Sequence, residues 1–304
     1  NCPDQNSADF KQLAGEAYYF RAWYYYGLLV NYGPVSIVEQ PLNPDAGEME
    51  PYNKRDARTK VADFIISDLK KAIENLSEKN NSASMRIHRD VARALMSEVA
   101  LFEGTWEKYH KGTKFADPTC TDAKIKEYLQ TAADAAKAVM DRGVWKIYSS
   151  GNPLNDYRVV FATTDLGSNP EILWYKKYDG DVVGNNVDRY LNTGGGGIGV
   201  TSSLVDDYLT IDGRPFVGEE KMNAKKVYGD ELNPSVRDPR LCQTVAMPGQ
   251  QLRPDQGPFK FPPLVGTGSA YGQNVTGYSL LKHNQIDYTG NLDAEYKGAT
   301  PAIQ

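Results

Sequence analysis

Apolar side chains recur every three or four residues along the first half of the chain, which is the spacing of amphipathic helices. The pattern predicts four helices, at residues 10–31, 56–77, 89–110 and 122–141. In the first, the predicted buried stripe is Leu13, Ala17, Phe20, Tyr24 and Leu28. Gly33-Pro34 and Gly143 supply the stop signals after the first and last of these helices.

The last three of these helices start at a regular interval, near residues 57, 89 and 121. An interval of about 32 residues is typical of helical repeats, and the small residues from Ala132 to Ala138 resemble the close-packing positions of tetratricopeptide repeats. Each period holds one long helix plus a loop, where a tetratricopeptide repeat has two short helices. The expected fold is mainly α, a tetratricopeptide-like helical scaffold with large irregular loop insertions.

From residue 146 onward Gly, Pro, Asn, Asp and Tyr dominate, and few helical stripes remain. A short helix is expected at 202–210. Long structured loops of this kind usually carry a binding face on a rigid scaffold. We therefore expect residues 1–145 to form the helical scaffold. Residues 146–304 should form a loop-rich, ligand-facing region packed on it, so that the two make one structural unit.

Composition narrows the function classes. With 34 Lys+Arg against 39 Asp+Glu, the formal charge is −5, which argues against a nucleic-acid binder. No run of 18 apolar residues is present. The three cysteines, Cys2, Cys120 and Cys242, are far apart and show no metal-ligand spacing. No cofactor, metal or catalytic residue is predicted.

Motifs for chemistry are weak. His88, His110 and His283 form no closely spaced metal pair. Gly194, Gly196 and Gly199 fit a dinucleotide-binding pattern formally, but no clear strand precedes them and no acidic residue follows at the required distance. Paired acids for glycoside hydrolysis stay open, because carboxylates are abundant throughout the chain.

Tyrosine is the compositional outlier, with 20 residues against 9 Phe and 4 Trp. A phenol suits a half-wet surface better than a dry core, because its hydroxyl needs a partner. The tyrosines from Tyr18 to Tyr32 fall on or beside the first helix, where we expect mainly packing. Those between residues 170 and 280 lie among loops, where a ring can stack on the C–H face of a sugar.

Six segments in order resemble one family. Residues 15–35 look like an E-x-x-F-x-R-A helix that runs into a Y-G-x-V-P turn, and 61–72 and 91–104 resemble the two following helices. Later segments are similar to an N-x-E-I turn at 169–172, a helix with a D-G-R-P turn at 202–215, and R-D-P-R-L at 237–241. Together they resemble the SusD/RagB family of outer-membrane nutrient-binding lipoproteins of Bacteroidetes.

The departures from the family pattern concern two residues and both ends of the chain. Ser36 replaces the usual Pro, and Glu98 replaces an Arg. Cys2 lies too close to Glu16 to be the lipid anchor, so the anchor Cys is expected outside this chain. The chain looks as if it lacks its N- and C-terminal ends, the latter including further helices.

The resemblance implies a cell-surface, outer-membrane lipoprotein that captures an oligosaccharide or polysaccharide and delivers it to a TonB-dependent, SusC-like transporter. It is expected to bind without enzymatic turnover. From composition, the expected ligand-binding residues are Trp174, Tyr178, Tyr190 and Tyr271 for stacking, with Asn185 and Asn186 for hydrogen bonds. Two alternatives remain: a glycan-active hydrolase, and a helical-repeat scaffold that binds only a protein partner. The sequence leaves the glycan itself undetermined.

Overall fold

The computed structural model describes residues 6–43, 45, 47–192, 198–252, 257–260, 274–287 and 298–303. The chain divides into two compact units. Unit 1 comprises Asn1–Asn80 and Arg86–Trp145, and unit 2 comprises Asn81–Met85 and Lys146–Gln304.

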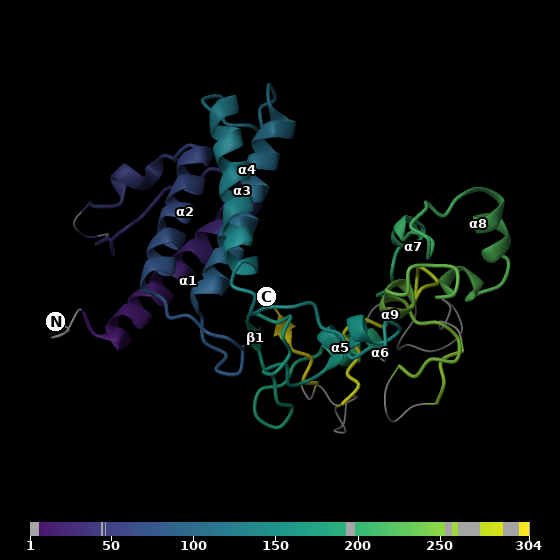
Figure 1. The fold of residues 1–304 in the computed structure, drawn as a ribbon. Coiled ribbons are helices and arrows are strands. Elements are labelled where there is room, and N and C mark those ends of the chain that lie inside the picture. Colours follow the sequence, from purple (N-terminus) through teal and green to yellow (C-terminus); the bar gives the residue numbers. More distant parts are fainter. Residues whose placement is uncertain are drawn as a thin grey trace. The chain divides into compact units, whose positions relative to one another are not determined.

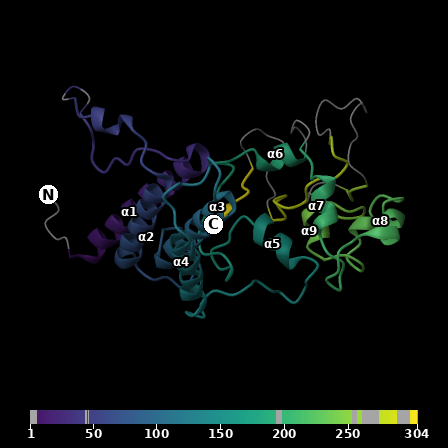
Figure 2. The ribbon, with the colours of Figure 1, turned by 90° about the horizontal axis from the view of Figure 1, so that it is seen from above.

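Unit 1 consists mainly of four long helices, shown in purple to teal in Figure 1. They are α1 (Ala8–Tyr32), α2 (Arg58–Asn75), α3 (Arg89–His110) and α4 (Asp122–Met140), with a 3₁₀ turn, η2, at Glu50–Asn53. Neighbouring helices in the sequence lie side by side, α1 with α2, α2 with α3, and α3 with α4 (Figure 2). The mainly helical, tetratricopeptide-like class predicted from the sequence is confirmed, and each predicted helix is present within a few residues of its expected ends.

The inner helices bury the faces that their apolar spacing predicts. Val61, Ile65 and Leu69 of α2 are completely inaccessible to solvent, and Val91, Leu95 and Val99 of α3 are nearly so. Gly104 of α3 permits a close approach to α4, because a Cβ atom there would lie 2.9 Å from the Leu129 side chain. Packing of these stripes, rather than helix propensity, is what stabilises such helices in water.

The buried face predicted for the first helix is wrong. Leu13, Ala17, Phe20, Tyr24 and Leu28 are all exposed. The buried residues of α1 are instead Gly15, Tyr19, Ala22 and Leu29. Large apolar and aromatic residues occur all round this helix, so a spacing of three and four fits more than one face.

Glycine decides which face of α1 meets its neighbour. A Cβ atom at Gly15 would lie only 2.7 Å from Cγ of Leu76, at the end of α2. The missing side chain therefore permits close contact of α1 with α2 at this point. No periodicity calculation that scores only hydrophobicity detects this, because it gives glycine little weight.

Unit 2 contains short elements joined by long loops. They are α5 (Asp156–Ala162), α6 (Val187–Asn192), α7 (Ser202–Asp207), α8 (Gly218–Ala224), η3 (Asp230–Leu232), α9 (Leu241–Thr244), and strands β1 (Tyr175–Lys176) and β2 (Ala302–Ile303). The two strands pair antiparallel, with Tyr175 opposite Ile303. The helix expected at 202–210 is present but ends at Asp207.

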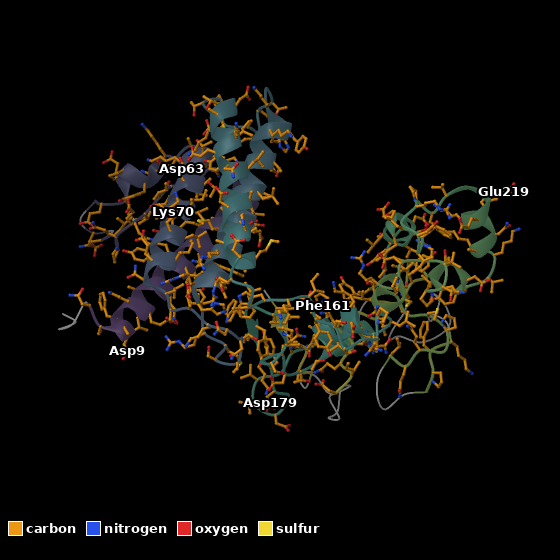
Figure 3. All side chains as sticks on the ribbon, viewed as in Figure 1. Asp9, Asp63, Lys70, Phe161, Asp179 and Glu219 are labelled. Carbon is orange, nitrogen blue, oxygen red and sulfur yellow. The ribbon has the colours of Figure 1, made fainter. Side chains whose placement is uncertain are left out.

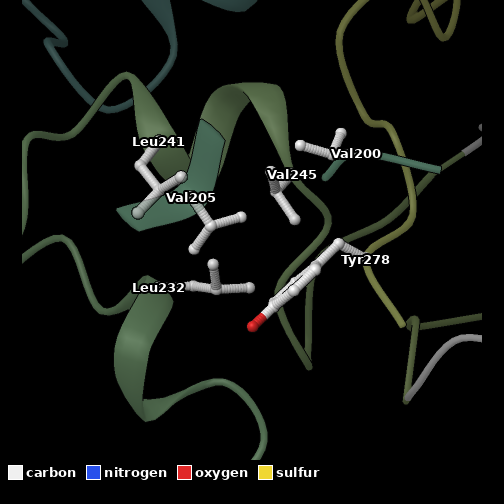
Figure 4. Packing of buried hydrophobic residues seen from close by; sticks show 6 residues of the cluster. All are labelled: Val200, Val205, Leu232, Leu241, Val245 and Tyr278. Atoms are coloured by element: carbon white, nitrogen blue, oxygen red, sulfur yellow. The ribbon is translucent and has the colours of Figure 1, made fainter. Parts of the chain in front are cut away.

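Small clusters of apolar residues replace a continuous core in unit 2. One contains Val200, Val205, Leu232, Leu241, Val245 and Tyr278, drawn in Figure 4. These residues come from α7, η3, α9 and the loops, and their side chains converge although the residues are far apart in sequence. A second cluster contains Val160, Leu166, Ile172 and Tyr175. Short elements are thus held together by contacts that no local pattern encodes.

Candidate functional site

A cleft of about 680 Å³ opens on unit 2. Its lining comes from five stretches of chain, at 147–149, 153–157, 171, 209–213 and 238–240. Apart from the first turn of α5, all of them are loops. The position of each wall therefore depends on hydrogen bonds that hold these loops together.

Arg237 fixes the stretch of chain that leads into the wall at residues 209–213. Its side chain is completely buried, and it donates from Nη1 to the Glu231 carbonyl at 2.7 Å and from Nη2 to the Val205 and Tyr208 carbonyls at 2.7 and 2.8 Å. The guanidinium carbon lies 3.7 Å from the centroid of the Phe216 ring. Desolvation lowers the pKa of this guanidinium, which nevertheless stays charged at physiological pH.

A tight turn presents the apolar lip of the same wall. Gly213 has φ +81°, a left-handed conformation that favours glycine, and the Arg214 N–H donates to Thr210 Oγ1 at 3.0 Å. Leu209, directly before this turn, and Ile211, within it, are exposed at the cleft. The lip therefore offers apolar surface to a ligand.

Gln243, which is buried on α9, joins the next two walls. Its side-chain amide donates to the carbonyls of Pro153 and Pro239, both at 2.9 Å, and its oxygen accepts from the Arg158 N–H at 3.0 Å. One side chain thus fixes the start of α5 against the loop that carries Asp238.

Glu171 anchors the remaining wall. Its Oε2 accepts a hydrogen bond from the Tyr148 N–H at 2.9 Å, and the Lys146 N–H donates to the Pro170 carbonyl at 3.0 Å. The Tyr148 ring packs against the cluster that contains Val160. Oε1 of Glu171 accepts no hydrogen bond within the described part of the chain, so it is free to accept one from a ligand.

Two carboxylates of the cleft are stabilised in their ionised form. The pKa of Asp156 is lowered, mainly by a hydrogen bond from the Ser150 hydroxyl, and that of Asp238 is lowered, mainly by a hydrogen bond from Arg240. Neither carboxyl group is protonated near neutral pH, so neither is poised to give up a proton as a general acid. The cleft combines apolar and aromatic surface with hydrogen-bond acceptors.

The residues predicted from the sequence lie elsewhere in unit 2. The Trp174 indole N–H donates to the Met85 carbonyl at 2.9 Å, which fixes this side chain to the backbone. Asn185 donates from Nδ2 to the Thr300 carbonyl at 2.8 Å and accepts from the Val187 N–H at 3.1 Å, so its amide holds a turn. Asn186 is half-buried beside it.

Two predicted aromatic rings keep solvent access. Tyr178 is half-buried under the Lys176 ammonium group, which lies 4.7 Å from the ring centroid, and Tyr190 on α6 is 49% exposed. Tyr271 falls outside the described residues. None of the five described candidates lines the cleft, and their role in binding stays a prediction.

Two segments that resemble family motifs supply residues of the cleft, although the sequence did not indicate them as binding residues. The R-D-P-R-L segment supplies both Arg237, which organises a wall, and the cleft residues Asp238 and Arg240, while the N-x-E-I turn supplies Glu171. Composition favoured the Tyr-rich stretch after residue 170. The cleft instead takes its tyrosines, Tyr148 and Tyr157, from just before it.

Unit 1 has a separate cavity of about 540 Å³, between the ends of its helices. Arg58, nearly inaccessible, lines it and pairs with Glu103, with 2.8 Å between Nη2 and Oε2. The Arg58 guanidinium carbon also lies 4.3 Å from the centroid of a Trp106 ring. Burial raises the pKa of Glu103 to about 7, because the Arg58 charge offsets only part of the desolvation.

Within the described ranges, no group of three His, Cys, Asp or Glu side chains is arranged to hold a metal ion. No helix among them combines the length and apolar character needed to cross a membrane.

One unit of helical repeats and a second unit with a loop-built, tyrosine-lined cleft are the organisation of a binding protein, and similar proteins share it. A family profile described as starch-binding and associating with the outer membrane matches residues 1–101, and the SusD family profile matches residues 165–302. The chain belongs to the SusD/RagB family. No protein with a curated description matches it.

Solved structures show the same fold. A SusD-like protein of Bacteroides fragilis is 23% identical with a TM-score of 0.66, and the match covers 98% of this chain and 55% of that one. A SusD-like carbohydrate-binding protein of the same species is 16% identical with a TM-score of 0.70, covering 100% and 54%. A laminarin-binding SusD-like protein is 16% identical with a TM-score of 0.54, covering 99% and 58%. This chain thus spans little more than half the length of these relatives.

Proposed function

We propose that the chain is part of a cell-surface, outer-membrane lipoprotein that captures an oligosaccharide and delivers it to a TonB-dependent, SusC-like transporter. The cleft of unit 2 is the proposed contact site. The observation that supports this site most is the combination, in one cavity, of apolar and tyrosine surface with a carboxylate oxygen, Oε1 of Glu171, that accepts no hydrogen bond from the described residues. Sugars need both, since their C–H faces are apolar and their hydroxyls donate hydrogen bonds.

Family membership and the relatives' ligands support the same proposal. One related structure is described as laminarin-binding, and another is described with a xylogluco-oligosaccharide. The lowered pKa values of Asp156 and Asp238 favour binding over hydrolysis, because a glycosidase needs one carboxylic acid that stays protonated. The loop that carries Tyr178 and the helix α6 that carries Tyr190 are a second proposed contact surface.

Affinity electrophoresis through gels that contain neutral polysaccharides tests the proposal. Tyr148→Ala combined with Arg240→Ala should weaken retardation by about tenfold or more, since stacking and hydrogen bonding are each worth about 1 kcal/mol. Tyr178→Ala combined with Tyr190→Ala tests the second proposed contact surface by the same measurement of retardation. Circular dichroism and thermal melting confirm that both variants fold.

The alternatives have distinct outcomes. Failure of every polysaccharide to retard the wild-type protein would contradict the proposed function. New reducing ends after incubation with a polysaccharide would favour the hydrolase. If only the Tyr178/Tyr190 variant loses retardation, the site is the loop surface and the cleft is excluded.

A further inference from the structure

The charges that line the cleft do not balance. Asp156, Glu171 and Asp238 contribute three carboxylates, and Arg240 contributes one guanidinium. Arg240 is already committed to Asp238, with Nη2 and Oδ2 2.5 Å apart. Asp156 and Glu171 have no ion-pair partner among the described residues. The lining therefore carries an excess of negative charge.

Neighbouring cations in the described part of the chain do not pair with Asp156 or Glu171. Lys282 lies behind the lining, where it donates to the Tyr157 hydroxyl at 2.8 Å, with its Nζ 3.7 Å from the centroid of the Phe161 ring. Arg158, which follows Tyr157, donates to the carbonyls of Gln251 and Leu252. Arg214, beside the turn of the lip, pairs with Asp212. Lys282 and Arg158 keep their positive charges, because phenol, ring and carbonyl partners are uncharged, but among the described residues neither forms an ion pair with Asp156 or Glu171.

The excess acts on a ligand through two effects. Sugar hydroxyls are donors, and Oε1 of Glu171 accepts no hydrogen bond from the described residues, so an uncharged polyol finds an acceptor there. A uronate or sulfate group would meet the side chains of Asp156 and Glu171, with which no described cation forms an ion pair, and like charges a few ångströms apart repel each other. The formal charge of −5 on the whole chain adds to this repulsion at low salt.

We propose that the cleft is selective for uncharged glycans and discriminates against those that carry carboxylate or sulfate groups. This inference rests on the proposed function, since it assigns a ligand class to the same site. Asp156 and Glu171 are the residues that set the discrimination.

A matched ligand pair tests this inference. A neutral polysaccharide that retards the wild-type chain is oxidised at its primary hydroxyls, which converts C6 alcohols to carboxylates and leaves the backbone linkage unchanged. Wild-type affinity for the oxidised form should be weaker by about tenfold. Asp156→Asn combined with Glu171→Gln keeps the shape of both side chains. This double variant should reduce the ratio of the affinities for the neutral and the oxidised polysaccharide by about threefold or more, and 0.5 M salt should do the same for the wild-type chain.

Glu219→Gln combined with Glu220→Gln is the charge-matched control. Both residues lie on α8, outside the cleft lining, and Figure 3 labels Glu219 at the surface. This control should leave the ratio unchanged. Equal affinity for both ligands, or equal narrowing by the control, would overturn the selectivity while leaving glycan binding intact. Absence of binding to either ligand would overturn the proposed function itself, and the selectivity with it.

Discussion

The two units of the molecule are stabilised by different means. In unit 1, long helices bury stripes of apolar residues, such as Val61, Ile65 and Leu69, that recur with the helical period. In unit 2, small clusters like the one in Figure 4 are supplemented by buried polar side chains, Arg237 and Gln243, that bind several loop carbonyls each. The comparison indicates that unit 1 depends on many apolar contacts of similar kind, whereas unit 2 depends heavily on a few buried polar residues.

Replacing Arg237 should have the largest effect. Arg237→Ala leaves the carbonyls of Glu231, Val205 and Tyr208 without their donor and removes the stacking on Phe216. Each orphaned buried acceptor costs about 1–3 kcal/mol, so we expect a loss of about 3–5 kcal/mol in the free energy of unfolding of unit 2. This loss is measured by denaturant unfolding, with hydrogen exchange of peptides from each unit used to assign it to unit 2.

Arg240→Ala is the matched control for Arg237→Ala. The Arg240 side chain is 62% exposed and, among the described residues, its ion pair is with Asp238, so its removal should cost less than about 1 kcal/mol. If both variants unfold at the same denaturant concentration, the buried hydrogen bonds of Arg237 stabilise unit 2 no more than the exposed ion pair of Arg240 does.

Two adjacent leucines of α1 test whether apolar burial on one helix face stabilises unit 1. Leu29 is completely buried and Leu28 is 38% exposed. Leu29→Ala should cost about 2–4 kcal/mol, because it creates a cavity, whereas Leu28→Ala should cost about 1 kcal/mol or less. The spacing argument favoured Leu28 as the buried residue, so equal losses, or a larger loss at Leu28, would restore that interpretation.

The helices of unit 1 could be predicted because their information is local. Arg89–His110 was predicted with the observed ends, and α4 begins after Thr121, as its capping residue indicates. The face of α1 could not be predicted, because the deciding contact pairs Gly15 with Leu76, far along the chain. Periodicity determines that a helix has a buried side, but an all-round apolar helix leaves the side undetermined.

The candidate site was harder to predict for the same reason. Its cleft unites Tyr148, Glu171, Leu209 and Asp238, which lie in separate loops. Arg237 and other polar residues link these loops by hydrogen bonds to backbone carbonyls. Every residue has such a carbonyl, so the sequence does not show which one a side chain binds. Motif resemblance did include residues 169–172 and 237–241, yet it gave no indication that they meet.

The two units should also respond to pH in opposite directions between pH 5 and 7. In unit 1, burial, with the nearby charges of Glu107 and Asp117, raises the pKa of Glu103 to about 7, although Arg58 acts in the opposite direction. The folded state then binds more protons than the unfolded state, so this group favours folding at about pH 4.5 and loses that contribution as pH rises to 7. Glu107, whose pKa is also raised by burial, acts in the same sense.

In unit 2, His283 has the opposite effect. Burial, with the nearby Lys282 charge, lowers its pKa below the ordinary value of 6.5. The unfolded state then binds more protons, so unit 2 loses stability as pH falls below about 6.5. Hydrogen exchange of unit-specific peptides at pH 5, 6 and 7, corrected for intrinsic rates, should show opposite slopes. Glu103→Gln should flatten the first slope and His283→Asn the second, and parallel slopes in the two units would contradict the assignment.

A pair of helix caps gives the smallest expected effect and tests how far the units are independent. Thr121 Oγ1 accepts from the Lys124 N–H at 3.2 Å at the start of α4, and Thr201 Oγ1 accepts from the Leu204 N–H at 3.3 Å at the start of α7. Replacing either threonine by alanine should cost about 1 kcal/mol, and serine should restore most of it.

The difference between the two cap variants should lie in where the loss is observed. Thr121→Ala should raise hydrogen exchange in peptides of unit 1 alone, and Thr201→Ala in peptides of unit 2 alone, because each cap stabilises only the helix that it begins. A single cap variant that raises exchange equally in both units would show that they open as one cooperative unit. The contrast between a helix-built and a loop-built core would then describe two styles of packing within one folding transition.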